Sequence, residues 1–509
     1  PYFEIDPLKI DIKEVASVVS TAYARRLQVI PVKVEKTKIV VATAEPYALS
    51  WIREFQDVTN KQVEVVVASH TAIKYFIEEF FTVRSATQEF KRENPREAGS
   101  RGDFSAVIEL DRMLKGTKGD ITKDASAVVR IVDWLFQFAC TERATDIHIE
   151  PKHGKGQVRF RIDGKMRVVY SFEPELMIPV VSRIKILAEM QVDERRKPQD
   201  GRIRYRLADG REMEMRLSTI PVQYGEKIVT RIFDPKMVGK SFEDLGFADE
   251  DIDRWESLIN LPHGLVLVTG PTGSGKSTTL HTSLRLVAKE DVNICTVEDP
   301  VEIMNDDLNQ MQVNYKLDIT FGNAIRAFLR QDPDIIMVGE IRDTDAGKMA
   351  IQAALTGHLV LSTLHTNDAV SSITRLIDLG IPPHLITASL RGMMAQRLVR
   401  RLCEFCREKV PTSPAAWAEV VGPHPVAMPS HVYAPKGCRE CKHTGYLGRL
   451  CVYEMVLMDR ELKDSIRSSV TLEELMDITK GKYVPLRVCG AHKIIEGVTS
   501  LDEVLRVIF

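Results

Sequence analysis

The sequence contains no apolar run long enough to cross a membrane. A membrane-spanning helix needs about 20 consecutive apolar residues, whereas the longest apolar stretches here, such as residues 264–268, have the length of a strand. It also lacks an extended Pro, Gly or Ser tract, and its 44% hydrophobic and 28% charged residues are typical of a folded chain. We therefore expect folded domains whose association with a membrane is at most peripheral.

Neither sign of charge is in clear excess. The chain has 69 Lys and Arg residues against 71 Asp and Glu residues, so its formal net charge is −2. This balance excludes a basic surface over the whole chain of the kind that binds nucleic acid. It does not exclude a basic face on one part of the chain. A length of 509 residues excludes a single small domain and suggests about three or four domains.

The chain has 8 cysteines, an ordinary number for its length, so it is not a disulfide-rich protein. No secretory signal is visible at Pro1, so we expect a reducing compartment, in which C-x-x-C pairs bind metal more often than they form disulfides. Four thiolates suit Zn²⁺ in a closed, structural site; free buried thiols and a redox pair are the alternatives. The proposed ligands are Cys403, Cys406, Cys438 and Cys441. The four that we expect in the core are Cys140, Cys295, Cys451 and Cys489.

Hydrophobic periodicity predicts a multidomain α/β fold. Residues 1–83 mix helical and strand patterns, as in a small α/β domain, and residues 84–104 have the composition of a linker. Residues 105–240 begin with a helix behind Asp124 and continue as alternating strands. Arginines alternate with apolar residues in two of these strands, so one face of the sheet is lined by arginine. That face is either a solvated surface or a binding face.

The last domain, residues 241–509, is expected to contain a parallel sheet with helices on both faces. Short apolar strands alternate with helical patterns there, which is typical of such sheets. The predicted strands are residues 265–268, 294–297, 335–338 and 360–363.

Residues 270–277 match the phosphate-binding pattern G-x-x-x-x-G-K-[ST] between a strand and a helix, as the motif requires. Glycines let backbone N–H groups point at phosphate oxygens, and the helix N-terminus adds its positive end. We expect Lys276 to bridge the β- and γ-phosphates of ATP and Ser277 to offer its hydroxyl to Mg²⁺. A chance glycine loop is the alternative. The predicted nucleotide-binding residues are Gly270, Pro271, Thr272, Gly273, Ser274, Gly275, Lys276, Ser277 and Thr278.

Two carboxylates, Glu298 and Glu340, follow apolar strands of the same domain. Ligands bind at the carboxyl ends of strands in open parallel sheets, so both are candidates for positioning or deprotonating water. Gly339 precedes Glu340, where the usual Walker B pattern has Asp at the strand end. We therefore expect Mg²⁺ to be held mainly by Ser277, phosphates and water. A helix cap or an ion pair is the alternative for each carboxylate, and which Glu is the base stays open.

Four sequence blocks occur in order and resemble the hexameric ATPases of type II secretion and type IV pilus assembly, the GspE/PilB family. They correspond to the phosphate loop, the aspartate box, an atypical Walker B and the histidine box of that family. The blocks are residues 270–277, 296–302, 330–342 and 356–365. Upstream, residues 146–151 and 196–202 resemble the family's second N-terminal domain, and the spacing of the four cysteines resembles its zinc motif. The resemblance covers about residues 124–509, with a looser match over 1–83.

This resemblance implies a PAS-like second domain paired with a RecA-like ATPase domain, in a ring of six chains with nucleotide between the two domains. It implies further roles for two sets of residues, with a purely structural role as the alternative for each. The arginines that reach nucleotide would be Arg202, Arg216, Arg326 and Arg330. The sensors of nucleotide state would be His358 and His365.

The function implied is a motor at the cytoplasmic face of the inner membrane that turns a platform protein and adds pilin or pseudopilin subunits. Residues 1–83 would dock on a membrane-anchored protein. In some relatives this region binds cyclic di-GMP through Arg-Leu-Gly, where this chain has Arg26-Leu27-Gln28. A pilus retraction ATPase and a RecA-like nucleic-acid translocase are the alternatives. We expect no nucleic-acid partner, because no basic and aromatic binding module is recognisable.

Overall fold

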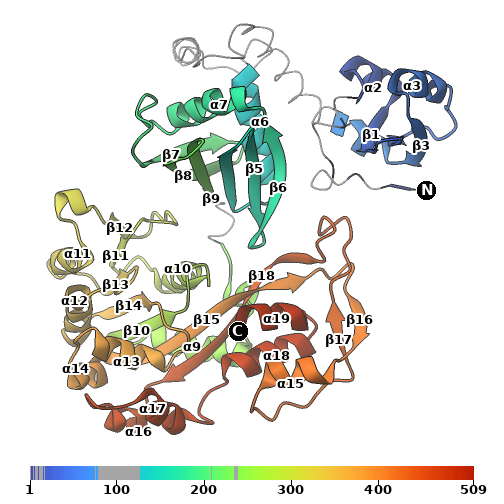
Figure 1. Ribbon diagram of the computed structural model, residues 1–509. Helices are drawn as coiled ribbons and strands as arrows, with labels where there is room; N and C mark the ends of the chain where they lie inside the picture. Colours follow the sequence, from blue (N-terminus) through green and yellow to red (C-terminus); the bar gives the residue numbers. More distant parts are fainter. Residues whose placement is uncertain are drawn as a thin grey trace. The chain divides into compact units, whose positions relative to one another are not determined.

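The computed structural model (Figure 1) describes residues 2, 3, 5, 10, 15, 18–74, 76, 77, 127–207, 209–233 and 239–508. The chain forms two compact units, residues 1–234 and 235–509. The expected linker, residues 84–104, and the expected cap Asp124 lie outside the described residues. Within the described ranges, no helix has both the length and the apolar character that a membrane crossing requires.

The first part of the chain folds as a small α/β domain around a three-stranded sheet. In this sheet β2 pairs antiparallel with β1 and parallel with β3. Ser20 caps the first helix by accepting a hydrogen bond from Tyr23 N, and the helix ends at Gln28, whose φ of 50° lies in the left-handed region that favours glycine. The elements are α2 (Thr21–Leu27), β1 (Val29–Val34), β2 (Lys38–Thr43), α3 (Trp51–Thr59) and β3 (Gln62–Val67).

Residues 127–233 form a six-stranded antiparallel sheet in the order β6-β5-β4-β9-β8-β7. The predicted Asp163-Gly164 turn is confirmed, with a φ of 47° and 81° at the two residues, as a two-residue hairpin requires. The elements are α6 (Ala127–Thr141), β4 (Asp146–Lys152), β5 (Lys155–Ile162), β6 (Lys165–Phe172), α7 (Pro174–Leu187), β7 (Gln199–Arg206), β8 (Glu212–Val222) and β9 (Gly225–Phe233).

One face of this sheet is apolar and the other carries a row of charged residues. The apolar face includes Ile147, Val158 and Met215, which are fully buried. On the other face the register places Arg161, Asp146, Arg231, Arg216 and Arg202 opposite one another in turn across five adjacent strands. Directly opposite residues share a face of a sheet. The expected arginine-lined face is therefore present.

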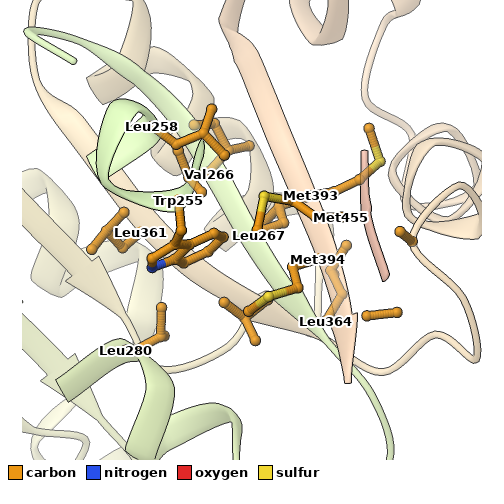
Figure 2. Packing of buried hydrophobic residues seen from close by; sticks show 14 of the residues in the cluster. Trp255, Leu258, Val266, Leu267, Leu280, Leu361, Leu364, Met393, Met394 and Met455 are labelled. Carbon is orange, nitrogen blue, oxygen red and sulfur yellow. The ribbon is translucent and has the colours of Figure 1, made fainter. Parts of the chain in front are cut away.

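The second unit is built on a seven-stranded sheet in the order β12-β11-β13-β14-β10-β15-β18, shown in green to red in Figure 1. All pairs are parallel except β15 with β18. Consecutive residues Val266 and Leu267 of β10 are both fully buried, so the sheet is covered on both faces. Figure 2 shows them among apolar side chains that include Trp255 and Met393. The predicted parallel sheet is confirmed.

The strands of this unit alternate with helices. The elements up to the fifth parallel strand are α8 (Phe242–Leu245), α9 (Asp249–Ile259), β10 (Gly264–Thr269), α10 (Lys276–Val287), β11 (Ile294–Glu298), β12 (Asn309–Gln312), the 3-10 turn η2 (Tyr315–Leu317), α11 (Phe321–Phe328), β13 (Ile335–Val338), α12 (Thr344–Leu355) and β14 (Leu359–Leu364). The remaining elements are α13 (Ser371–Asp378), α14 (Pro383–Ser389), β15 (Leu390–Leu402), β16 (Glu408–Pro411), α15 (Pro414–Val421), β17 (His431–Ala434), β18 (Tyr446–Leu457), α16 (Arg460–Ser465), α17 (Leu472–Thr479), α18 (Leu486–Ile495) and α19 (Leu501–Ile508).

The last helix, α19, is attached to β15 by a buried ion cluster. Glu503 is 1% exposed and accepts hydrogen bonds from Arg400 Nη2 at 2.6 Å and from Arg506 Nε at 2.9 Å. The Arg400 guanidinium lies 3.8 Å from the ring centroid of Tyr446 on β18. Burial alone would raise the pKa of Glu503, but Arg506 and Arg400 hold that pKa at about 2. The cluster therefore stabilises the fold only while Glu503 is ionised.

This cluster generates the first prediction, for Glu503→Gln. The pKa of Glu503 is about 2 in the folded protein, and an unfolded Glu has a pKa of about 4.3. The charge therefore stabilises fully above about pH 5, by roughly 3 kcal/mol, and this stabilisation is lost as the pH falls through 4 towards 2. In urea unfolding at pH 7 the variant is expected to be less stable by about that amount, and the gap to begin narrowing below about pH 5.

Asp502→Asn on the same helix is the control, because Asp502 is exposed. Hydrogen exchange of residues 501–508 localises the effect to α19. Equal stability of Glu503→Gln and wild type at pH 7 would contradict the role given to the cluster.

Candidate functional site

The phosphate loop connects β10 to α10 at the carboxyl edge of the parallel sheet. Three of its residues, Gly270, Gly273 and Gly275, have φ values of 146°, 80° and 91°, which side chains other than glycine rarely adopt. The first N–H groups of α10, at Lys276 and Ser277, have no acceptor within their own helix and point along its axis towards its amino end, where the loop lies. The loop is thus an anion-binding cradle.

Lys276 lies inside this cradle. Its Nζ donates to the carbonyl oxygens of Gly270 at 2.8 Å and of Pro271 at 3.2 Å. Burial lowers the pKa of Lys276, against the opposing effect of Glu340. Ser274 Oγ is buried and has no hydrogen-bond partner among the described residues. An ammonium held by carbonyls and a buried hydroxyl without an acceptor both fit a site that receives phosphate oxygens.

Glu340 follows β13 at the same edge and lies in a small charged cluster. Its carboxylate pairs with Arg342 Nη2 at 2.5 Å and approaches His365 Nε2 at 3.4 Å. Arg342 also lies 3.5 Å from Asp299, so residues from three strand ends meet here. Burial, followed by the charge of Lys276, lowers the pKa of His365, while Glu340 opposes the shift. An imidazole 3.4 Å from the Glu340 carboxylate can accept or relay a proton near the loop.

Glu298, by contrast, is engaged inside the protein. It is 5% exposed, and its Oε1 accepts from Thr296 Oγ1 at 3.0 Å and from Gln310 Nε2 at 3.2 Å. His281 Nε2 of α10 lies 3.1 Å from the other carboxylate oxygen. Glu298 therefore connects β11 to α10, which carries the loop lysine. Its carboxylate oxygens are more fully occupied by hydrogen-bond partners than those of Glu340, so it is less able to bind a water molecule.

The two histidines of the histidine box lie at opposite edges of the sheet. His358 precedes β14, and its carbonyl accepts from Gly264 N at the start of β10, whereas His365 follows β14 beside the loop. A six-residue strand separates them, which is roughly 20 Å. His358 Nδ1 lies 2.9 Å from the Ala353 carbonyl at the end of α12. His358 therefore does not reach the phosphate loop of its own chain.

Arg326 and Arg330 lie at the end of α11 and after it, in the segment that leads to the amino end of β13. Arg326 pairs with Asp345 and donates to Asn323 Oδ1, and Arg330 donates to the Arg326 carbonyl at 2.9 Å. Asp345 lies in the first turn of α12, the helix that follows the carboxyl end of β13. Among the described residues, none of these bonds joins Arg326 or Arg330 to the phosphate loop of its own chain.

Arg202 and Arg216 lie in the first unit and face each other across β7 and β8. The Arg216 guanidinium lies over the Phe233 ring, 4.8 Å from its centroid, and 3.6 Å from Glu214. Arg216 is 12% exposed and Arg202 47% exposed, so Arg202 is the more accessible to a ligand.

The four predicted cysteine ligands converge on one point. Their sulfur atoms all lie within 4.8 Å of one another, with Cys403–Cys438 and Cys406–Cys441 distances of 3.7 Å. Tetrahedral Zn–S bonds of about 2.3 Å place sulfur atoms about 3.8 Å apart, so the spacing fits zinc. Backbone N–H groups of Cys438 and Gly445 donate to Cys441 Sγ at 3.2 Å, which favours a thiolate. Of the other cysteines, three are buried as expected, and Cys140 is only partly buried.

Sequence reasoning did not find the partners that hold these groups. Arg342 stands within the Walker B block, two residues after Glu340, and was identifiable there. His281 and Gln310 pair with Glu298 only through the fold, and nothing in the local sequence marks them. Gln396 of β15, which donates to the Ser274 carbonyl at 2.8 Å, was missed for the same reason.

Family models and solved structures are similar to large parts of the chain. The family described as "Type II/IV secretion system protein" matches residues 121–506, and an MshEN domain matches residues 1–87. Two solved structures show a similar fold: the ATPase DotB of Legionella pneumophila, with a TM-score of 0.55 at 21% identity over 73% of this chain and 93% of that one, and the pilus retraction motor PilT with bound ADP, with a TM-score of 0.51 at 24% identity over 74% and 96%.

Curated relatives are similar over most of the chain. The type IV pilus assembly ATPase TfpB of Acinetobacter baylyi is 45% identical over 100% of this chain and 86% of its own. The type IV pilus assembly ATPase PilB of Myxococcus xanthus is 37% identical, over 99% and 87%. The type II secretion system protein E of Pectobacterium carotovorum is 38% identical, over 97% of both chains. With its phosphate loop and acidic strand ends in place, this chain belongs to the type II/IV secretion system protein family and is an ATPase of that family.

Proposed function

We propose that the chain is a motor that hydrolyses ATP to drive assembly of pilin or pseudopilin subunits at the inner membrane. The observation that carries this proposal is the meeting of a phosphate loop with Lys276, Glu340 and His365 at one sheet edge, in a chain whose curated relatives include pilus assembly ATPases. We infer a place at the cytoplasmic face of that membrane, with an inner-membrane platform protein as the mechanical target.

In this proposal Glu340 is the residue that orients or deprotonates the attacking water. It lies at the loop edge, is 14% exposed, pairs with the charge of Arg342 and has His365 Nε2 3.4 Å away. Glu298, which is buried and bonded to His281, would position α10 rather than act as the base. Lys276 would bind the β- and γ-phosphates. Ser277 would supply the hydroxyl that holds Mg²⁺, whose charge offsets the charge that develops in phosphoryl transfer.

A ring of six chains would explain the arginines and His358. Arg326 and Arg330 bond to Asp345, Asn323 and the Arg326 carbonyl and not to their own phosphate loop, so in this proposal they act on nucleotide held by another chain. Arg202 and Arg216 keep in this proposal the role that the family resemblance implies, which is contact with nucleotide. An arginine placed on a γ-phosphate contributes about 10³–10⁵ in rate in other enzymes.

The proposed domain division is 1–83 for docking, 84–104 as linker, 105–240 as the PAS-like domain and 241–509 as the ATPase domain. The first domain would dock on a membrane-anchored protein. Zn²⁺ is the proposed ligand of Cys403, Cys406, Cys438 and Cys441, because their sulfur spacing suits it.

The second prediction concerns Lys276→Ala. Removal of the ammonium takes away the only lysine of the phosphate loop, so ATPase activity is expected to fall to background, together with pilus assembly or secretion in cells. Phosphate release by the purified full chain and complementation of a deletion strain are the measurements. Lys289→Ala, at an exposed position after α10, is the control and should behave as wild type. Full transport without ATPase activity would refute the motor.

The third prediction separates the two acidic strand ends. Glu340→Gln is expected to lower kcat by at least about 10²-fold while nucleotide affinity stays near that of wild type, because a general base acts in the chemical step. Glu298→Gln removes one partner of a buried His and is expected to reduce stability as well as activity. Steady-state kinetics, MgADP titration and thermal unfolding test both variants. If Glu298→Gln alone lost kcat at unchanged stability, the assignment would be reversed.

The fourth prediction concerns the metal. Cys403→Ser is expected to lower bound zinc from about one per chain to near zero and to reduce stability, because a closed four-thiolate site contributes its binding free energy to folding. Metal content by mass spectrometry and thermal unfolding are the measurements. Cys140→Ser, outside the cluster, is the control and should keep its zinc. Unchanged metal content in Cys403→Ser would contradict the proposal that these four cysteines bind zinc.

A further inference from the structure

The backbone of the phosphate loop must be held in its conformation by groups other than the nucleotide. Its N–H groups must stay open for phosphate, so other groups must hold its backbone in place. One side chain outside the loop does so. Gln396 of β15 donates from Nε2 to the Ser274 carbonyl at 2.8 Å, and its Oε1 accepts from Thr279 Oγ1 of α10 at 2.9 Å. The amide thus joins the loop to the helix that follows it.

Gln396 lies where the strand passes under the loop. β15 pairs with β10 up to the register Thr269–Ala395, and Gln396 is the next residue. A Cβ at Gly270 would lie 2.6 Å from the Gln396 carbonyl oxygen, and one at Gly275 would lie 3.1 Å from Gln396 Nε2. One residue therefore touches both the first and the last glycine of the loop. These contacts are a second reason, in addition to the φ values, why both positions require glycine.

Burial indicates that this amide is not there for packing. Gln396 and Thr279 are both 0% exposed, and the core around the sheet is made mainly of apolar side chains. A buried amide destabilises a core unless it is hydrogen-bonded, and an apolar residue of the same size would pack without that requirement. The Thr279 hydroxyl orients the amide, since it donates to Oε1; Nε2 then donates to the Ser274 carbonyl at 2.8 Å and to Cys451 Sγ at 3.9 Å.

The bond to Ser274 has a geometric consequence at the next residue. A trans peptide is planar, so the Ser274 C=O and the Gly275 N–H point in opposite directions. When Gln396 holds this carbonyl on the strand side, the Gly275 N–H must face the opposite side, which is the inside of the cradle. We propose that Gln396 is a positioning residue of the nucleotide site, which holds the Ser274–Gly275 peptide so that its N–H meets a nucleotide phosphate. This inference rests on the proposed ATPase function and names a residue that acts through the loop.

The test compares Gln396→Leu and Gln396→Glu in the full chain. Both remove the amide donor, and the Leu variant also removes the polar group. We expect the dissociation constant for MgADP carrying a methylanthraniloyl label to rise at least tenfold in both at pH 8, and KM for MgATP to rise more than kcat falls. A role in folding alone would lower the amount of active protein without this split between KM and kcat.

The Glu variant adds a pH signature. Burial raises the pKa of a carboxyl, and a protonated Glu can again donate to the Ser274 carbonyl. MgADP binding by Gln396→Glu, taken relative to wild type, is therefore expected to tighten at least threefold between pH 8 and pH 6, whereas Gln396→Leu should show no such recovery. If Gln396→Leu fails to fold, the nearly isosteric Gln396→Glu variant and the pH dependence of its MgADP binding test the positioning role of Gln396.

Val399→Ala is the matched control, because Val399 is a fully buried residue of the same strand that follows the loop contacts. It should lower stability and keep KM. Wild-type affinity in both Gln396 variants, or loss of kcat at unchanged KM, would overturn the positioning role. Failure of the wild-type chain to bind MgADP would instead overturn the proposed function.

Discussion

The parallel order of β11, β13, β14 and β10 is the constraint on which the site depends. In a parallel sheet every strand ends at the same edge, so the segments that follow four strands meet there, although they are distant in sequence. Lys276, Asp299, Glu340 and His365 follow different strands in this way. The fully buried apolar residues on both sides of β10 keep the strands in register. Packing of apolar residues thus fixes where the charged groups stand.

The motifs that sequence reasoning identified correctly are local. The phosphate loop, the strand before it and the helix after it are contiguous, and the four apolar strands were recognisable because each is short and buried on both faces. The cysteine pairs were recognisable from spacing, since two C-x-x-C turns suit one tetrahedral ion. In each case a few neighbouring residues carry the whole signal.

The partners across the fold were not predictable in this way. In the sequence Glu298 looked equivalent to Glu340, because both follow apolar strands. Only the fold shows that Glu298 contacts His281, whereas Glu340 pairs with Arg342. The sequence did place His358 and His365 at the two ends of one strand, and β14 confirms it. Sequence alternation predicted an arginine-lined face, but the row that brings Arg202, Arg216 and Arg231 opposite one another depends on the register of three strands.

The hairpin of β15 and β18 relates the cysteine site to the nucleotide site. β15 runs from the loop contact at Gln396 to Leu402, next to Cys403, and β18 begins at Tyr446, five residues after Cys441. Beside Gln396, Arg397 Nη2 donates to the Asn367 carbonyl at 2.9 Å, and Glu454 accepts from Ala369 N at 2.8 Å, so the hairpin also holds the loop that follows His365. One pair of strands therefore contacts the phosphate loop and the loop after His365 and ends beside the cysteine cluster, although these three segments are far apart in sequence.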